Sequence, residues 1–283
     1  MLNSSYYPGM SVGKIFIKSL RFYGDRFNAL FLPFLIVSLI KSVLWKFAFD
    51  LIPQFKIQPG FTENFLVQFI TYLTFVIPIV MAFSVISWII DFFPSGLIVK
   101  YSSGVLEGRT SNLVASLKTV IYKIFSLLLI GLITGLLVVL GLVLLIIPGI
   151  IMAVVFSLAI QVMIIEGSGV FDSLRKSREL VSKRPWQAFS VLLFAFLLIA
   201  MAGVVGEILC SHLIRTEGYF RLVIISVIIS VVKPLQPVAL TYLYYSLSVS
   251  QKFQEPRKPY QPIFSAPPPI GRKFQELVEY HPK

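Results

Sequence analysis

The chain has 283 residues, of which 57% are hydrophobic and only 13% are charged. A soluble globular protein carries about 25% charged residues, so this composition excludes that class and indicates a polytopic membrane protein. The formal net charge of +12 raises nucleic-acid binding as an alternative, which the distribution of the charges along the chain disfavours.

Six segments are long and apolar enough to cross a bilayer, which takes about 20 residues per helix. We predict spans at residues 28–49, 66–90, 124–147, 150–165, 187–206 and 222–249. The fold class expected is therefore an all-α membrane helical bundle over residues 28–251. Residues 1–27 form an N-terminal segment with an interfacial helix, and the proline-rich tail 252–283 is expected to be disordered.

The third and fourth spans come from one apolar run. Residues 124–165 hold 42 positions without a charge, roughly twice a single span. Pro148 and Gly149 lie inside the run, where proline removes a backbone donor and glycine permits a tight turn. We predict a helical hairpin that turns at these two residues.

Lysine and arginine are distributed unevenly between the two sides of the membrane. With the N-terminus inside, the inner segments hold nineteen of them and the outer segments hold four. Because basic residues favour the cytoplasmic side, we expect a multi-pass protein of the cell membrane with both termini cytoplasmic. This distribution also accounts for the net charge without nucleic acid.

Basic amphipathic segments precede the first, third and fifth spans. Their apolar residues recur every 3.6 positions opposite lysine and arginine, as in helices that lie in the membrane interface. We expect either contacts with anionic lipid headgroups or topological anchoring alone. The candidate headgroup contacts are Lys14, Lys18, Arg21, Lys118, Lys123, Arg175 and Lys176.

The three amphipathic segments share a short sequence. It reads Ser19-Leu20-Arg21, Ser116-Leu117-Lys118 and Ser173-Leu174-Arg175. Each is followed by two spans, so one interpretation is a threefold internal repeat. The alternative is that any inner loop needs positive charge and any interfacial helix needs an apolar face.

Ionisable residues inside spans are candidate functional sites, since charge in the bilayer is costly. Lys41 and Lys233 lie within spans, Asp91 near the inner end of the second span and Glu207 near the outer end of the fifth. Lys233 precedes Pro234, which interrupts the sixth span. A Lys233–Asp91 pair is plausible from depth, and snorkelling of each charge to the interface is the alternative.

Catalytic and metal-binding patterns are absent from the sequence. One cysteine and two distant histidines cannot supply a Cys/His metal site, and the carboxylates are few and scattered. We expect no cofactor, no metal and no enzymatic activity.

The stretch Ile146-Ile147-Pro148-Gly149-Ile150-Ile151, the pair Glu166-Gly167 and the segment Ser173–Val181 resemble a known family. It is the membrane domain attached to some glycerophosphoryl diester phosphodiesterases, with related free-standing prokaryotic membrane proteins. The resemblance implies a six-helix membrane module. It implies no phosphodiesterase activity, which belongs to a separate soluble domain.

Two functional hypotheses follow. The first is a non-enzymatic membrane module at the cytoplasmic face. It would organise lipid, possible anionic lipid included, or a partner protein, which could be a second copy of the chain. The alternative is a transporter or channel with a polar site around Lys233, where intramembrane charge meets an interrupted helix.

Overall fold

The computed structural model describes residues 9–52, 64–109, 111–213 and 218–254, and this part of the chain is helical without strands. The helices are α1 (Val12–Asp25), α2 (Phe27–Leu51), α3 (Asn64–Leu106), α4 (Leu113–Tyr122), α5 (Ile124–Leu144), α6 (Ile146–Val155), α7 (Ala159–Glu166), α8 (Val170–Ser182), α9 (Pro185–Ile208), α10 (Gly218–Val232) and α11 (Leu235–Gln254). A short π-helical segment, Leu209–Leu213, extends α9.

Six helical segments of the described chain are long and apolar enough to cross a membrane. The prediction of an all-α multi-pass membrane bundle is therefore confirmed. The fourth and sixth segments are each built from two helices, α6 with α7 and α10 with α11. The tail after Gln254 lies outside the described residues, so its predicted disorder stays a prediction.

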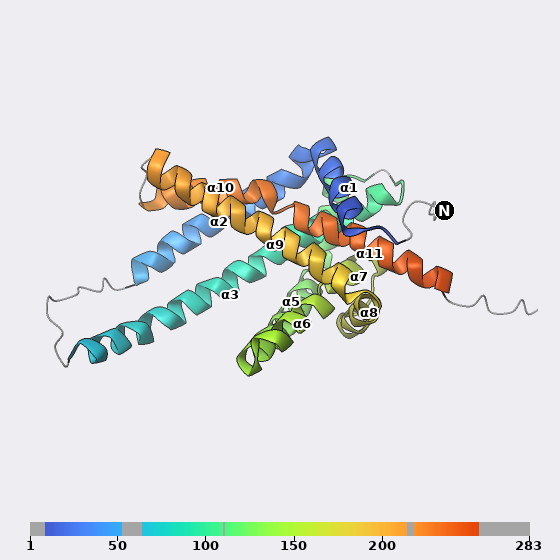
Figure 1. The fold of residues 1–283 in the computed structure, drawn as a ribbon. Coiled ribbons are helices and arrows are strands. Elements are labelled where there is room, and N and C mark those ends of the chain that lie inside the picture. The colour runs from blue at the N-terminus through green and yellow to red at the C-terminus, as the bar shows by residue number, and fades with distance from the viewer. Residues whose placement is uncertain (1–8, 53–63, 110, 214–217, 255–283) are drawn as a thin grey trace, which may run out of the picture.

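The second span is much longer than predicted. Helix α3 does not end near Ile90 but continues to Leu106, so its 43 residues measure about 64 Å, twice the hydrocarbon thickness. Its N-terminal part projects away from the other helices (Figure 1). The extension beyond Pro94 is helical because packing holds it: Leu97, Ile98 and Val99 are all buried.

The α5–α6 hairpin reverses at Leu145, which has an extended backbone, and not at Pro148–Gly149 as predicted. Pro148 lies in the first turn of α6, where a missing N–H costs no hydrogen bond. Gly149 serves close packing, because a Cβ atom on Gly141 would lie 2.8 Å from the Gly149 Cα atom. The proline and glycine therefore begin the second arm of the hairpin.

Helix α11 is the centre of the bundle. Every residue from Pro237 to Leu247 is buried, as expected for a helix that is surrounded on all sides. Helices α1, α3, α7, α8 and α9 all pack against it (Figure 1). The break before α11 falls at Lys233–Pro234, where the sequence predicted an interruption.

The amphipathic helices pack in a cyclic pattern, which is compatible with the interpretation of the sequence as a threefold repeat. We call α3, α7 and α11 the closing helices, because each ends one of the three predicted units. Helix α4 packs on α3, α8 packs on α7, and α1 packs on α11, so each amphipathic helix lies on the closing helix of the unit before it. The closing helices also contact one another, which makes them the common core of the three units.

The shared Ser-Leu-basic sequence marks equivalent positions in these contacts. Ser19, Ser116 and Ser173 are all buried. Each hydroxyl donates a hydrogen bond to the carbonyl four residues earlier, at 2.7, 3.1 and 2.7 Å. A small side chain that satisfies its own hydroxyl lets each amphipathic helix approach its closing helix closely.

Candidate functional site

Three predicted intramembrane charges come together at the junction of α2, α3 and the α10–α11 break. The Oδ2 atom of Asp91 accepts hydrogen bonds from Lys41 Nζ at 2.7 Å and from Lys233 Nζ at 2.6 Å. The three side chains are 18–22% exposed. The pair expected between Lys233 and Asp91 is thus present, with Lys41 as a second partner.

Local structure explains how the chain positions these groups. Lys233 sits between the end of α10 and the start of α11, and its ammonium lies 5.9 Å from the ring centroid of Phe34 on α2. Helix α1 is tied to the same region, because Tyr23 donates a hydrogen bond to the Val231 carbonyl at 2.7 Å. Burial raises the pKa of Tyr23 to about 12, so the hydroxyl stays protonated and able to donate further into the alkaline range than an exposed tyrosine.

The cluster carries an excess of positive charge. Two ammonium groups share one carboxylate oxygen, while Asp91 Oδ1 is buried without a hydrogen-bond partner among the described residues. Ser87, one turn earlier on α3, has a buried hydroxyl that also lacks a hydrogen-bond partner among the described residues. Chemically, the cluster can bridge three helical elements or hold a small polar or anionic group.

Glu207 is not part of this cluster. It pairs with Arg221 across the α9–α10 connection, where Arg221 Nε lies 3.3 Å from Glu207 Oε2, and both side chains are at least one-third exposed. The predicted four-residue site is therefore a three-residue cluster plus a separate surface ion pair.

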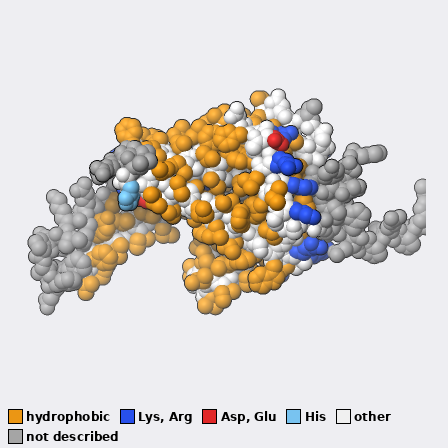
Figure 2. All heavy atoms as spheres, turned by 45° about the horizontal axis from the view of Figure 1, so that its top comes forward, with side chains coloured by type: hydrophobic (Ala, Val, Ile, Leu, Met, Phe, Trp, Pro, Cys, Tyr) orange, Lys and Arg blue, Asp and Glu red, His pale blue; other side chains and the backbone are white. Residues whose placement is uncertain are grey.

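The second candidate site is the basic end, which we define as the end of the bundle that carries α1, α4 and α8. Figure 2 shows Lys and Arg side chains in a row along one end of a largely hydrophobic surface. Lys14, Arg21, Lys118 and Arg175 are exposed there.

The other three predicted headgroup contacts at the basic end already interact with groups of the protein, which leaves them less free to bind a lipid headgroup. Lys176 Nζ donates to Glu166 at 2.5 Å, and Lys123 Nζ donates to the Met163 carbonyl at 3.4 Å. Lys18 is half-buried and also makes interactions within the protein. Of the seven predicted contacts, four therefore point to the outside without a partner in the described part of the chain.

Each amphipathic helix has apolar residues on two faces. One stripe packs into the protein: on α1 it contains Ile15, Phe16 and Phe22. On the other face, Leu20 is 52% exposed and Ile17 is 63% exposed. Exposed apolar residues recur on the other two helices, including Ile121 and Phe171. The outer apolar stripe lies next to the basic residues, an arrangement typical of a helix at a lipid surface.

Two glutamates that the charge analysis did not select hold the closing helices together. Tyr245 donates a hydrogen bond to Glu107 at 2.8 Å, and the adjacent Tyr244 donates one to Glu166. Neighbouring tyrosines of α11 thus reach the ends of α3 and α7. Glu107-Gly108 repeats Glu166-Gly167, and both glycines adopt positive φ, 74° and 75°. This repeated dipeptide is the sequence signal that identifies the pair.

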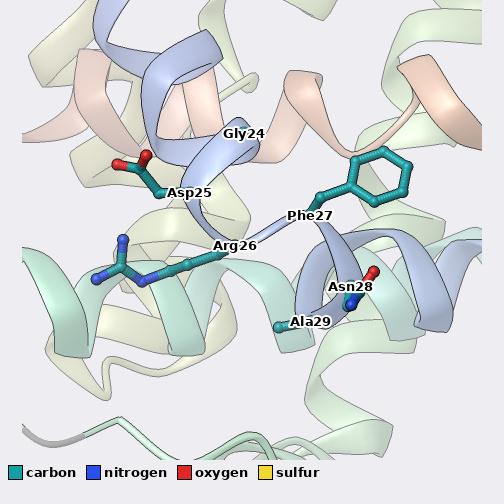
Figure 3. A pocket seen from close by; sticks show the side chains of 6 residues that line it. All are labelled: Gly24, Asp25, Arg26, Phe27, Asn28 and Ala29. Carbon is teal, nitrogen blue, oxygen red and sulfur yellow. The ribbon is translucent and has the colours of Figure 1, made fainter.

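Neither of two cavities found in the described structure is lined by the intramembrane cluster. The first, of about 340 Å³, is an open hollow lined by the consecutive residues 24–29 at the α1–α2 turn. Figure 3 shows the side chain of Phe27 pointing away from those of Asp25 and Arg26. The second, of about 190 Å³, lies between α3 and α4 and has polar and charged walls.

Comparisons with protein-family models, with curated proteins and with solved structures find no match for this chain. The resemblance to the phosphodiesterase-associated membrane domain therefore stays a prediction, and the function is argued from the geometry alone.

Proposed function

We propose that this protein is a non-enzymatic membrane module whose basic end binds and organises anionic lipid headgroups. The observation that carries the proposal is the cyclic packing of α1, α4 and α8 on the closing helices. It holds three basic, amphipathic surfaces at one end of one bundle. In this proposal the basic end faces the cytoplasm of a cell membrane, following the positive-inside rule.

The energetics favour binding by the three surfaces together. A lysine or arginine near an anionic leaflet contributes about 1 kcal/mol, so single residues bind weakly and several act in concert. The inner apolar stripes already pack on protein, and the amphipathic helices therefore need no folding on the membrane. A preorganised surface loses less conformational entropy when it binds.

Lipid enrichment around the reconstituted full chain tests this proposal. The protein is placed in nanodiscs of phosphatidylcholine with and without phosphatidylglycerol, and retained lipids are identified by native mass spectrometry. We expect retention of phosphatidylglycerol, reduced in a Lys14→Gln/Arg175→Gln variant. The matched control is Lys46→Gln/Arg221→Gln. It also removes two positive charges, but these belong to ion pairs on α2 and α10 and not to the amphipathic helices. Equal retention of both lipids by the unmodified protein would contradict the proposal, and a co-purifying protein would favour a scaffold.

A transporter or channel is the second candidate, because Lys233 at a helix break shares Asp91 with Lys41. A substrate path requires water access to this cluster. The test is labelling of Lys233→Cys in a Cys210→Ala background with a membrane-impermeant thiol reagent. Labelling from either side supports a path, whereas complete protection in sealed vesicles contradicts it.

A further inference from the structure

The cavity between α3 and α4 has the chemistry of an anion site. Its walls include Lys100 and Ser103 of α3, Glu107, Arg109 and Ser111 of the connection, and Thr119 of α4. It opens at the basic end, beside an amphipathic helix that carries an exposed apolar stripe.

The equivalent junction in the second unit explains why this one is hollow. Six residues, 107–112, connect α3 to α4, whereas three residues, 167–169, connect α7 to α8. At the shorter junction the chain's own cations fill the space. Lys176 pairs with Glu166, and Lys123 Nζ lies 3.6 Å from the position that a Cβ atom on Gly167 would take. The longer connection leaves the first junction open.

The cations at the open junction have unused binding capacity. Arg109 forms an ion pair with Glu107 through one guanidinium nitrogen, which lies 3.0 Å from Oε2, and the Arg109 side chain is 73% exposed. The Lys100 ammonium and the Ser111 hydroxyl have no hydrogen-bond or ion-pair partner within the part of the chain that the structure describes. An arginine fork, a lysine and a hydroxyl around one cavity match the several acceptor oxygens of a tetrahedral anion.

We propose that this α3–α4 cavity binds a single phosphate group, from a lipid headgroup or from free phosphate. At about 190 Å³ it is smaller than the 300–1,000 Å³ typical of pockets for drug-sized ligands, so it suits one small group. The Glu107 carboxylate limits the net positive charge of the walls and disfavours a second anion. The lipid form of this proposal rests on the proposed function, and names the site where one headgroup is held.

Direct binding to the full chain in maltoside micelles, which contain no phosphate, tests the site. Inorganic phosphate and dioctanoyl phosphatidic acid are titrated separately by calorimetry. We expect Lys100→Gln to lower the affinity of the bound probe about tenfold, the typical effect of losing a charge-assisted hydrogen bond. Lys118→Gln, an exposed basic residue of α4 outside the cavity, is the matched control and should leave the affinity unchanged.

A second variant separates lost binding from lost folding. Ala115 lines the cavity on the exposed side of α4, and Ala115→Leu fills the space without changing any charge. It should abolish binding while thermal unfolding remains that of the unmodified protein. Binding of phosphatidic acid alone identifies a lipid headgroup, and binding of both probes identifies phosphate itself.

The proposal is overturned if neither probe binds, or if Lys100→Gln and Lys118→Gln weaken binding equally. Retention of phosphatidylglycerol that depends on Lys14 and Arg175 would then still support the proposed function. The experiments therefore distinguish a wrong assignment of the phosphate site from a wrong assignment of lipid binding to the basic end.

Discussion

Asp91 is the residue on which the intramembrane cluster depends, because it is the shared acceptor for two cations. Removing one lysine leaves a neutral ion pair, whereas removing the carboxylate leaves two ammonium groups side by side. The three positions should therefore respond very differently to substitution, although all three residues are charged and similarly exposed.

We expect Asp91→Asn to destabilise the protein by about 2 kcal/mol, below the ~3–5 kcal/mol for breaking a fully buried pair. Lys41→Met should be nearly neutral, since Lys233 still balances Asp91. Thermal unfolding in detergent micelles measures both. Equal melting temperatures for the two variants would show that the cluster has no charge imbalance.

Tyr23 should make stability depend on alkaline pH. Its pKa is raised to about 12 by burial, while an unfolded tyrosine titrates near 10. Because the pKa of Tyr23 is higher in the folded state, its full contribution to the stability of the fold is present below pH 10. That contribution is lost as the pH rises from about 10 to 12. We expect Tyr23→Phe, which cannot ionise, to flatten this part of the profile of melting temperature against pH. An unchanged slope in the variant would exclude Tyr23 as its source.

At the level of helices, glycine contacts set how closely the two arms of the α5–α6 hairpin approach. A Cβ atom on Gly141 would meet backbone atoms of α6, which cannot move aside as a flexible side chain can. We expect Gly141→Ala to cost about 1–3 kcal/mol of stability through overpacking. Gly203→Ala is the control, because its nearest neighbour would be 3.9 Å away. A neutral Gly141→Ala would mean that the arms are not in tight contact.

The buried serines of the amphipathic helices give a second test of helix packing. Ser173→Leu should destabilise by about 1–3 kcal/mol, because the closing helix α7 leaves no room for a larger side chain. Ser173→Ala should be nearly neutral, since the hydroxyl bonds only within α8. Ser182→Leu, exposed on the same helix, controls for added hydrophobicity. Tolerance of Ser173→Leu would argue against a close α7–α8 contact.

The helices could largely be predicted from the sequence, and their contacts could not. Apolar runs and 3.6-residue periodicity identify spans and amphipathic helices, because both depend on nearby residues. The length of α3 was missed, since Asp91 and Pro94 interrupt its apolar pattern while distant helices stabilise its continuation. An amphipathic stripe covered by protein has the same periodicity as one covered by lipid, so the sequence does not show that Leu20 of α1 is exposed while Phe16 is buried.

The candidate sites show the same division. Depth along each span suggested Lys233 with Asp91, and the structure adds Lys41 to that pair because α2 packs along α10. Glu207 was misplaced, as its partner Arg221 comes from the helix that follows it. The α3–α4 cavity has no local pattern at all: it depends on the length of a connection and on which helix the next segment meets.

For the whole molecule, topology is the property to test. In a Cys210→Ala background, Tyr122→Cys and Ser168→Cys should label from one side of sealed vesicles, and His212→Cys from the other. Tyr122 is 89% exposed before α5, and Ser168 follows α7, so both lie at the basic end. We expect cytoplasmic labelling for this pair. Labelling of Ser168→Cys from the same side as His212→Cys would show that α6 and α7 do not return across the membrane.

The contact between α1 and α11 has a consequence for biosynthesis. The Met10 amide donates to Ser246 Oγ at 3.0 Å, 236 positions further along the chain, and Gln187 donates to the Met10 carbonyl. Helix α1 leaves the ribosome long before α11, so the part of its inner stripe that packs on α11 stays uncovered until α11 is inserted. Helices α4 and α8 find their partners as soon as they are made. Only when α11 enters can these two helices meet, so premature termination before α11 should leave an inserted but unassembled protein exposed to quality-control proteolysis.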